Sequence, residues 1–340
     1  MSGIWGFVKR HKRKFIITSA VLGGGALVAR YAANKFEEWE KRHLKQLLAK
    51  EKKQQYFANI YQSCLTTCRN LTPKIKRAID KLLDVDGITL TLKNNPPNKV
   101  ELWEYLTLLT FTKNITFLVS SVLLSVLIHV QLGIIGGYLY RAQVEDDSAS
   151  VIDSSVQEQY LLACDHFINQ GLEELVAYIQ PIVKSVIQNI PLTKSVSTFD
   201  LQVFLNDIER VIVSDFKQAP KIYVRSMIAS EVNSMNNNGS FDGSWNDAIL
   251  NRMNTETSEL LETNEASIII SEILHMSWDF LLDACEENFS VVDNKLPLVK
   301  VVPILNGFFV GNVSCKWMDK VCKQTHLSTF MGNIYESFCT

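Results

Sequence analysis

The sequence predicts an all-α protein. Its 340 residues include only 15 glycines and 8 prolines, which is few for a chain built from strands and tight turns. Apolar residues make up 47% and charged residues 21%, a composition that can bury a sizeable core. In most segments the apolar residues recur at helical spacing, so we expect long helices packed around one core.

The charge of the chain is divided unevenly. Residues 1–53 hold 13 Lys and Arg against 4 Asp and Glu, whereas residues 54–340 hold 21 against 32. A basic start before an acidic body favours contact between the start and a membrane or another anionic surface. The acidic body is unsuited to gripping a nucleic acid, which needs a basic face.

The N-terminal segment combines a basic run, residues 9–14, with an uncharged apolar stretch, residues 15–29. Fifteen residues fall short of the roughly 20 that span a bilayer. Arg30 can extend its charge toward the interface and Tyr31 suits that depth, which lengthens the usable span. The pattern predicts an uncleaved membrane anchor.

Two other interpretations of this segment are weaker. Cleavage of a secretory signal after Ala29 needs a small residue at the third position counted back from the cut, where Leu27 stands. A soluble helix would be weakened by Gly23–Gly25. Basic residues flank the stretch on both sides, so their distribution does not choose an orientation.

After the anchor, residues 34–56 predict an amphipathic stalk helix. Its apolar residues fall on one side: Phe36, Trp39, Leu44, Leu47 and Leu48. The helical pattern continues from Phe57 to Cys68. Thr72 and Pro73 then have the form of an N-cap followed by a first-turn proline, so we expect a new helix there that ends at Gly87.

Residues 86–98 predict a connector. Alternating apolar residues at 88, 90 and 92 allow a short strand, and Asn94–Pro97 forbids its continuation. Asn98 with Glu101 three residues later has the spacing of a capping box, so a helix should start there.

Residues 114–140 contain no Asp, Glu, Lys or Arg. Length and hydropathy fit a second membrane span, and Gly133 and Gly137 match a small-residue packing pattern. Several serines with His129 and Gln131 make the stretch more polar than most spans. We favour a central helix buried in a bundle, weakened near Gly136 and Gly137, and the second span stays open as the alternative.

The rest of the chain reads as helices joined by loops. The predicted helices cover residues 156–188 (with weak points at Gly171 and Pro181), 199–216, 222–235, 256–289 and 333–338. The predicted loops are residues 145–150, 190–198 and 236–246, and residues 296–312 are expected to be irregular or briefly extended.

The seven cysteines are scattered and odd in number, which indicates reduced thiols in a large intracellular chain. Cys64 and Cys68 share a helix face by spacing, as do Cys322 and His326, and each pair offers two metal ligands. A structural zinc site needs about four. The sequence therefore predicts core packing for these residues, no metal site, and no catalytic motif.

The predicted helix after Asn98 carries Leu102, Leu106 and Leu109 on one face, with Trp103 and Tyr105 at its margin. Such a Trp either belongs to the core or forms the floor of a groove. Trp and Tyr are over-represented among binding hot spots.

Four stretches together resemble the peroxin-three family, which serves the biogenesis of peroxisomal membrane proteins. They are residues 10–29, 92–104, 130–140 and 296–307, with a similar ending at 333–338. The second and third stretches are specific, and the first is generic.

The resemblance implies an all-α protein with a single N-terminal transmembrane anchor followed by one elongated cytosolic helical-bundle domain. The expected organisation is a basic segment (1–14), the anchor (15–33), the stalk helix (34–56) and the bundle (57–340). It also implies that residues 114–140 are buried. The expected location is the peroxisomal membrane, with one span and the main domain facing the cytosol.

The resemblance further implies a partner, the cytosolic chaperone-receptor peroxin nineteen, whose amphipathic N-terminal helix lies in an apolar groove. Carried over by position, the groove residues are Thr89, Leu92, Lys99, Trp103, Leu106, Leu139, Leu298 and Lys300. We expect anionic lipid to be bound by Lys12, Arg13, Lys14 and Arg30.

No enzyme activity, cofactor, small-molecule substrate or nucleic acid is expected. The alternatives are a two-span membrane protein, a membrane-anchored tether of unknown partner, and a membrane-bound enzyme with scattered catalytic groups.

Overall fold

The computed structural model describes residues 3–145, 152–228, 245–289, 295–309 and 311–339, with side chains described from residue 35 onward except at a few positions. The chain divides into two compact units, residues 1–56 and residues 57–340. The second unit contains the hydrophobic core.

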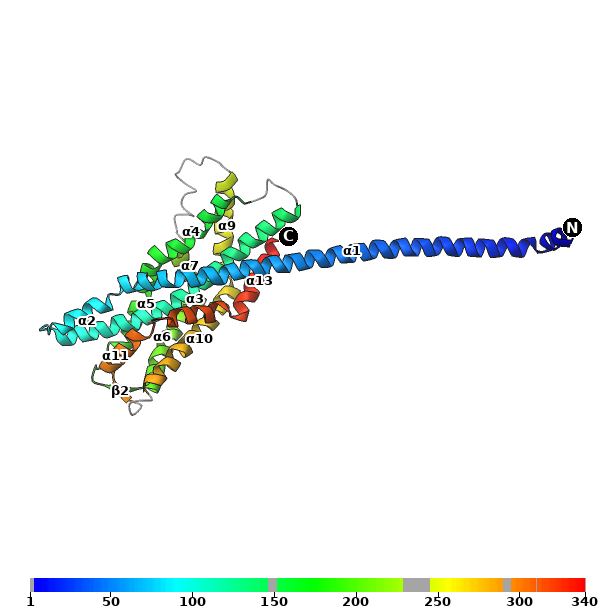
Figure 1. The fold of residues 1–340 in the computed structure, drawn as a ribbon. Coiled ribbons are helices and arrows are strands. Elements are labelled where there is room, and N and C mark those ends of the chain that lie inside the picture. Colours follow the sequence, from blue (N-terminus) through cyan, green and yellow to red (C-terminus); the bar gives the residue numbers. More distant parts are fainter. Residues whose placement is uncertain (1–2, 146–151, 229–244, 290–294, 310, 340) are drawn as a thin grey trace. The chain divides into compact units, whose positions relative to one another are not determined.

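The described chain is almost entirely helical, which confirms the all-α class (Figure 1). The helices are α1 (Gly3–Leu82), α2 (Val85–Lys93), α3 (Lys99–Glu145), α4 (Ser154–His166), the π-turn η2 (Phe167–Gly171), α5 (Leu172–Ile187), α6 (Thr198–Gln218), α7 (Lys221–Met227), α9 (Trp245–Leu261), α10 (Asn264–Phe289), α11 (Leu298–Gly307), α12 (Val313–Cys322) and α13 (Thr325–Phe338). Two short strands, β1 (Ser195–Ser197) and β2 (Lys295–Pro297), pair antiparallel with Val196 opposite Leu296.

The predicted helix start at Thr72 is wrong, because α1 continues through Pro73 to Leu82. A proline inside a helix removes one backbone donor. The Thr72 hydroxyl points back along the helix and donates to the carbonyl of Cys68 at 2.8 Å. Packing of the buried Ile75 and Ile79 holds the last turns in line.

The possible strand at residues 88–92 is also wrong, because these residues belong to α2. Asp84 caps this helix by accepting from the backbone N–H of Gly87 at 2.8 Å. In helical geometry Leu92 faces the core while Leu90 is 60% exposed. The predicted stop at Asn94–Pro97 and the helix start after Asn98 agree with the structure.

Helix α3 is the central helix of the bundle and packs against α5, α10, α11 and α13. Its segment Lys99–Val144 is long and apolar enough to cross a membrane, but 94% of its most apolar window is buried inside the protein. The predicted buried helix is therefore confirmed.

Buried polar residues of α3 find partners inside the bundle. Gln131 donates to the backbone carbonyl of Tyr160 on α4 at 2.7 Å, and its own carbonyl accepts from Cys164 at 3.3 Å. Such tertiary bonds explain why this helix is more polar than a lipid-facing span.

The expected weakening at Gly136 and Gly137 is wrong, because α3 continues to Glu145. These glycines instead let other elements approach the α3 backbone. A Cβ on Gly137 would lie 2.3 Å from the Cβ of Phe338 on α13. The loss of helix propensity is therefore offset by close helix packing.

The predicted helix 156–188 is present as α4, η2 and α5, with a π-turn at the expected weak point. Gly171 closes that turn, and a Cβ there would meet the carbonyl oxygen of Ser226 at 1.9 Å. Helix α7 can approach at this point because the side chain is absent.

The segment 296–312 is more regular than predicted. Pro297 ends β2 and precedes α11, which tolerates Pro303 inside it. The strand β1, which the sequence analysis assigned to a loop, is fixed by pairing with residues about 100 positions away. A three-residue strand has no sequence pattern that reveals its partner.

The predicted single helix 256–289 is wrong, because α9 ends at Leu261 and α10 begins at Asn264. The Thr263 hydroxyl accepts from the backbone N–H of Ala266 at 3.2 Å and so caps the new helix. Helix α7 ends at Met227, before the predicted end at residue 235. The loops predicted at residues 146–150 and 236–244 lie outside the described residues.

Candidate docking site

The predicted groove residues gather mainly where α2 meets α3, at the end of the bundle near α11 (Figure 1). We call this surface the α2–α3 corner and define it by Thr89, Leu92, Lys99, Trp103 and Leu106. Lys99, Trp103 and Leu106 share one flank of α3, because spacings of three and four residues return to the same helix face. The five-residue connection 94–98 holds α2 beside that flank.

These residues differ in depth. Leu92 and Leu106 are buried, at 7% and 3% exposure, so they form the base of the corner. Trp103 is half-buried and packs on the same core, and Lys99 is exposed at the rim, where its ammonium donates to Asn95 at 3.5 Å. Thr89 is half-buried and donates its hydroxyl to the carbonyl of Val85 at 2.8 Å.

Sequence reasoning missed two exposed apolar residues on the same two helices. Leu90 on α2 is 60% exposed, and Val100 on α3 is 67% exposed. Val100 lies one helical turn before Trp103. An apolar residue at a helix start looks like a core position in sequence, so only its exposure marks it as surface. Val100 adds exposed apolar area beside Trp103 that a partner could cover.

A second concave surface lies on the other flank of α3. This hollow has a volume of about 260 Å³ and lies between α3, α5, the loop after α5 and α11. Its lining residues are Glu101, Glu104, Tyr105, Thr107, Leu108, Lys184, Ile187, Gln188, Ile190, Leu192 and Leu298. Its floor is apolar, and its rim carries two glutamates and a lysine. Trp103 is not among its lining residues.

The structure does not bring all the predicted groove residues together. Leu298 is buried and lines the hollow rather than the corner, and Lys300 is exposed on α11. Leu139 lies 36 residues after Trp103 on the straight path of α3. At 1.5 Å per residue the separation is roughly 54 Å, too far for one groove. We therefore leave Leu139 out of the site.

The predicted lipid-binding residues Lys12, Arg13, Lys14 and Arg30 fall in the part of α1 whose side chains lie outside the description. Their role stays a prediction, as does the anchor at residues 15–33. The stalk residues that follow can be described: Phe36, Trp39 and Leu47 are each more than half exposed. Trp39 stacks on His43 with ring centroids 5.2 Å apart.

Of the two residue pairs predicted to share a helix face, one does so in the structure and the other does not. Cys322 ends α12 and His326 lies on α13, so the two do not share a helix face and that prediction is wrong. Cys64 and Cys68 do share a face of α1, and the fold brings His129 of α3 beside them. Thiol and imidazole side chains are common metal ligands.

Comparison with known proteins gives a consistent result. The family model "Peroxin-3" matches residues 6–98 and 141–298. Peroxisomal biogenesis factor 3 of Rattus norvegicus is 29% identical over 365 residues, covering 100% of this chain and 98% of that protein. Peroxisome biogenesis protein 3-2 of Arabidopsis thaliana is 24% identical over 326 residues, with 89% of each chain covered. Peroxisomal membrane protein PEX3 of Komagataella phaffii is 25% identical over 238 residues, covering 53% of this chain and 52% of its own.

Proposed function

Since the chain belongs to the Peroxin-3 family, we propose that it serves peroxisome biogenesis as a docking receptor in the peroxisomal membrane. Its partner in this proposal is the cytosolic chaperone-receptor peroxin nineteen, and the partner's amphipathic N-terminal helix binds at the α2–α3 corner. The proposal involves docking and release of cargo proteins, with no reaction catalysed by this chain.

The observation that carries the docking site is the apolar character of the corner. Trp103 is half-buried, while Val100, one helical turn before it on α3, is largely exposed. A partner helix that covered them would bury its own apolar stripe at spacings of three and four residues. Lys99 at the rim could pair with an acidic side chain of that helix and so set its register.

The burial of α3 supports a single-span topology. Because α3 is enclosed by the bundle, the N-terminal stretch 15–33 is the segment we assign to the membrane. We place the acidic body on the cytosolic side, where the partner circulates. The two-span alternative would require α3 to leave the bundle and give up the tertiary hydrogen bonds of Gln131.

Trp103 and Tyr105 provide a matched test, because they lie two residues apart on opposite flanks of α3. We would express residues 34–340 and titrate them against a fluorescently labelled peptide of the partner's N-terminal helix, following anisotropy. Trp103→Ala should weaken binding by about 30- to 1,000-fold, corresponding to about 2–4 kcal/mol for a hot-spot Trp. Tyr105→Ala, which removes an aromatic residue from the hollow, should bind nearly as tightly as the unaltered chain.

The opposite pattern would move the partner helix to the hollow beside Leu298. Equal binding by all three proteins would return Trp103 to a purely structural role. If the unaltered protein is folded by circular dichroism and does not bind the peptide, the docking proposal fails, and a tether for a different partner becomes the better hypothesis.

A further inference from the structure

A group of thiol and imidazole side chains meets in the interior of the second unit. The ligand atoms of Cys64, Cys68 and His129 all lie within 4.8 Å of one another. All three residues have 0% exposure. They come from two helices, α1 and α3, that are distant in sequence, so the fold itself assembles the group.

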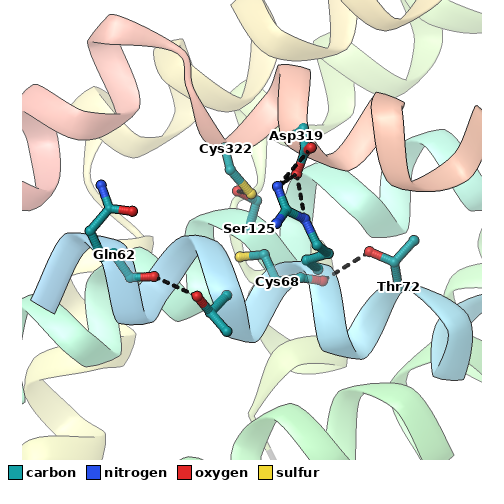
Figure 2. A network of polar contacts seen from close by, with 8 residues as sticks. Gln62, Cys68, Thr72, Ser125, Asp319 and Cys322 are labelled. Atoms are coloured by element: carbon teal, nitrogen blue, oxygen red, sulfur yellow. Dashed lines mark hydrogen bonds and ion pairs between the residues drawn. The ribbon is translucent and has the colours of Figure 1, made fainter.

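A third thiol borders this group. Cys322, at the end of α12, is buried, and its sulfur lies 3.3 Å from the hydroxyl oxygen of Ser125. A hydrogen bond with Cys68, together with burial, raises the pKa of Cys322, so the two thiols are neighbours. Figure 2 shows Cys68, Ser125 and Cys322 between the ribbons of α1 and α12, which are also joined by the Arg69–Asp319 ion pair at 2.8 Å.

One ring nitrogen of His129 is held by the backbone, and the other is left with its lone pair. Its Nδ1 lies 2.7 Å from the backbone carbonyl of Ser125, and a carbonyl can only accept, so Nδ1 carries the proton. The lone pair is therefore on Nε2. That atom is buried and has no hydrogen-bond partner among the described residues. In metal-bound histidines one ring nitrogen typically donates to a carbonyl, as Nδ1 does here, while the other nitrogen binds the metal.

Ordinary core packing does not account for this imidazole. A buried thiol packs as a small apolar residue, but a buried ring nitrogen without a partner is unfavourable. A cation held by the neighbouring sulfurs would supply the missing partner.

The ligand types select the metal. Thiolate and imidazole favour zinc, which takes four ligands in a tetrahedron. Three thiolates and one neutral imidazole around Zn²⁺ leave a net charge of −1, the charge of the Cys₃His class of structural zinc sites. Zinc–ligand bonds of about 2.0–2.3 Å would draw the three atoms together by about 1 Å. Cys322 would complete the tetrahedron by turning from Ser125 toward Cys68.

We propose that Cys64, Cys68 and His129, with Cys322 as fourth ligand, form a structural zinc site that joins α1, α3 and α12. On binding, each coordinating thiol gives its proton to the solvent and its sulfur to the metal. The site is closed, since four protein ligands leave no position for a substrate. Its role would be to fasten the part of α1 that follows the stalk to the bundle.

The test uses the full chain in detergent micelles, carrying a purification tag without histidines. Metal analysis by mass spectrometry should find about one zinc ion per chain. Cys64→Ser/Cys68→Ser should lose the zinc. Cys285→Ser is the matched control, because Cys285 is a buried thiol outside the group, and this variant should keep the zinc.

Cobalt gives a readout of the ligands themselves. Metal-free chain reconstituted with Co²⁺ should develop the visible bands of a tetrahedral ion and a thiolate-to-cobalt band in the near ultraviolet. Cys322→Ser should weaken the thiolate band by about a third, since three sulfurs become two. An unchanged band would remove Cys322 from the site.

The spectrum of the unaltered chain decides the matter even if the double variant does not fold. A helical chain that contains no zinc and gives no tetrahedral cobalt bands would overturn the proposal. So would a disulfide between Cys68 and Cys322, detected as the loss of two free thiols in the unreduced protein.

Discussion

At the scale of single residues, hydrogen-bonded pairs of titratable side chains make the stability of this chain depend on pH. His275 on α10 and Glu209 on α6 show how such a pair responds to pH. The Nδ1 of His275 donates to a Glu209 carboxylate oxygen at 2.9 Å. This hydrogen bond raises the pKa of His275, while burial raises the pKa of Glu209.

This pair predicts a pH-dependent contribution to stability. A raised histidine pKa means that the folded state binds the proton more tightly, so the stabilisation is fully present below about pH 6.5 and is lost as pH rises through the folded value. We expect His275→Gln to lower the melting temperature more at pH 5.5 than at pH 8.5. Circular dichroism melts at both values measure it.

The control for this prediction is His166→Gln, which removes a histidine from α4. The change in melting temperature that it causes at each pH is the baseline against which His275→Gln is compared. An equal loss at both values for His275→Gln would mean that the protonated ring adds nothing beyond a neutral contact.

At the scale of elements, the position of α3 determines whether the chain has a second membrane span. Its apolar stretch is covered by α5, α10, α11 and α13; of its buried polar groups, Gln131 bonds to α4 and Ser121 to the backbone of α3 itself. Its hydropathy is that of a membrane span, but its position is that of a core helix.

We therefore expect residues 34–340 to be soluble without detergent, while the full chain should fractionate with membranes. Size-exclusion chromatography and circular dichroism of the shorter protein measure this directly. The physical reason is that the remaining apolar helix is enclosed by its own bundle. A shorter protein that is recovered folded only in detergent would favour the two-span alternative.

At the scale of the whole molecule, the basic start and acidic body predict that lipid charge controls membrane contact. The stalk presents exposed apolar residues together with basic ones, the composition of a helix that lies on an anionic surface. We expect residues 34–340 to bind vesicles containing phosphatidylserine more tightly than neutral vesicles, with the difference decreasing as salt is added.

Substitutions of matched charge test where this contact lies. Lys45→Gln/Lys50→Gln/Lys52→Gln on the stalk should abolish most of the preference for anionic vesicles in a sedimentation assay. Lys217→Gln/Lys221→Gln/Lys323→Gln removes the same charge from the bundle and should leave the preference intact. Binding that ignores lipid charge would contradict this use of the stalk.

The elements that could be predicted from sequence are those with long helical periodicity. The helix containing residues 114–140 and the stop at Asn94–Pro97 are clear because apolar spacing and proline chemistry act locally. The errors lie where a distant contact outweighs a local preference. Pro73 and Gly137 remain inside helices because packing compensates for them, and β1 exists because β2 pairs with it.

The sequence by itself determined the helical class, the basic start and the position of Trp103 at the edge of a core stripe. Each of these depends on the spacing of residues within one segment. Only the tertiary structure decided that Leu139 lies far from Trp103, that Leu298 belongs to a separate hollow, and that His129 meets Cys64 and Cys68. These facts depend on how helices pack across long sequence separations, which local periodicity does not encode.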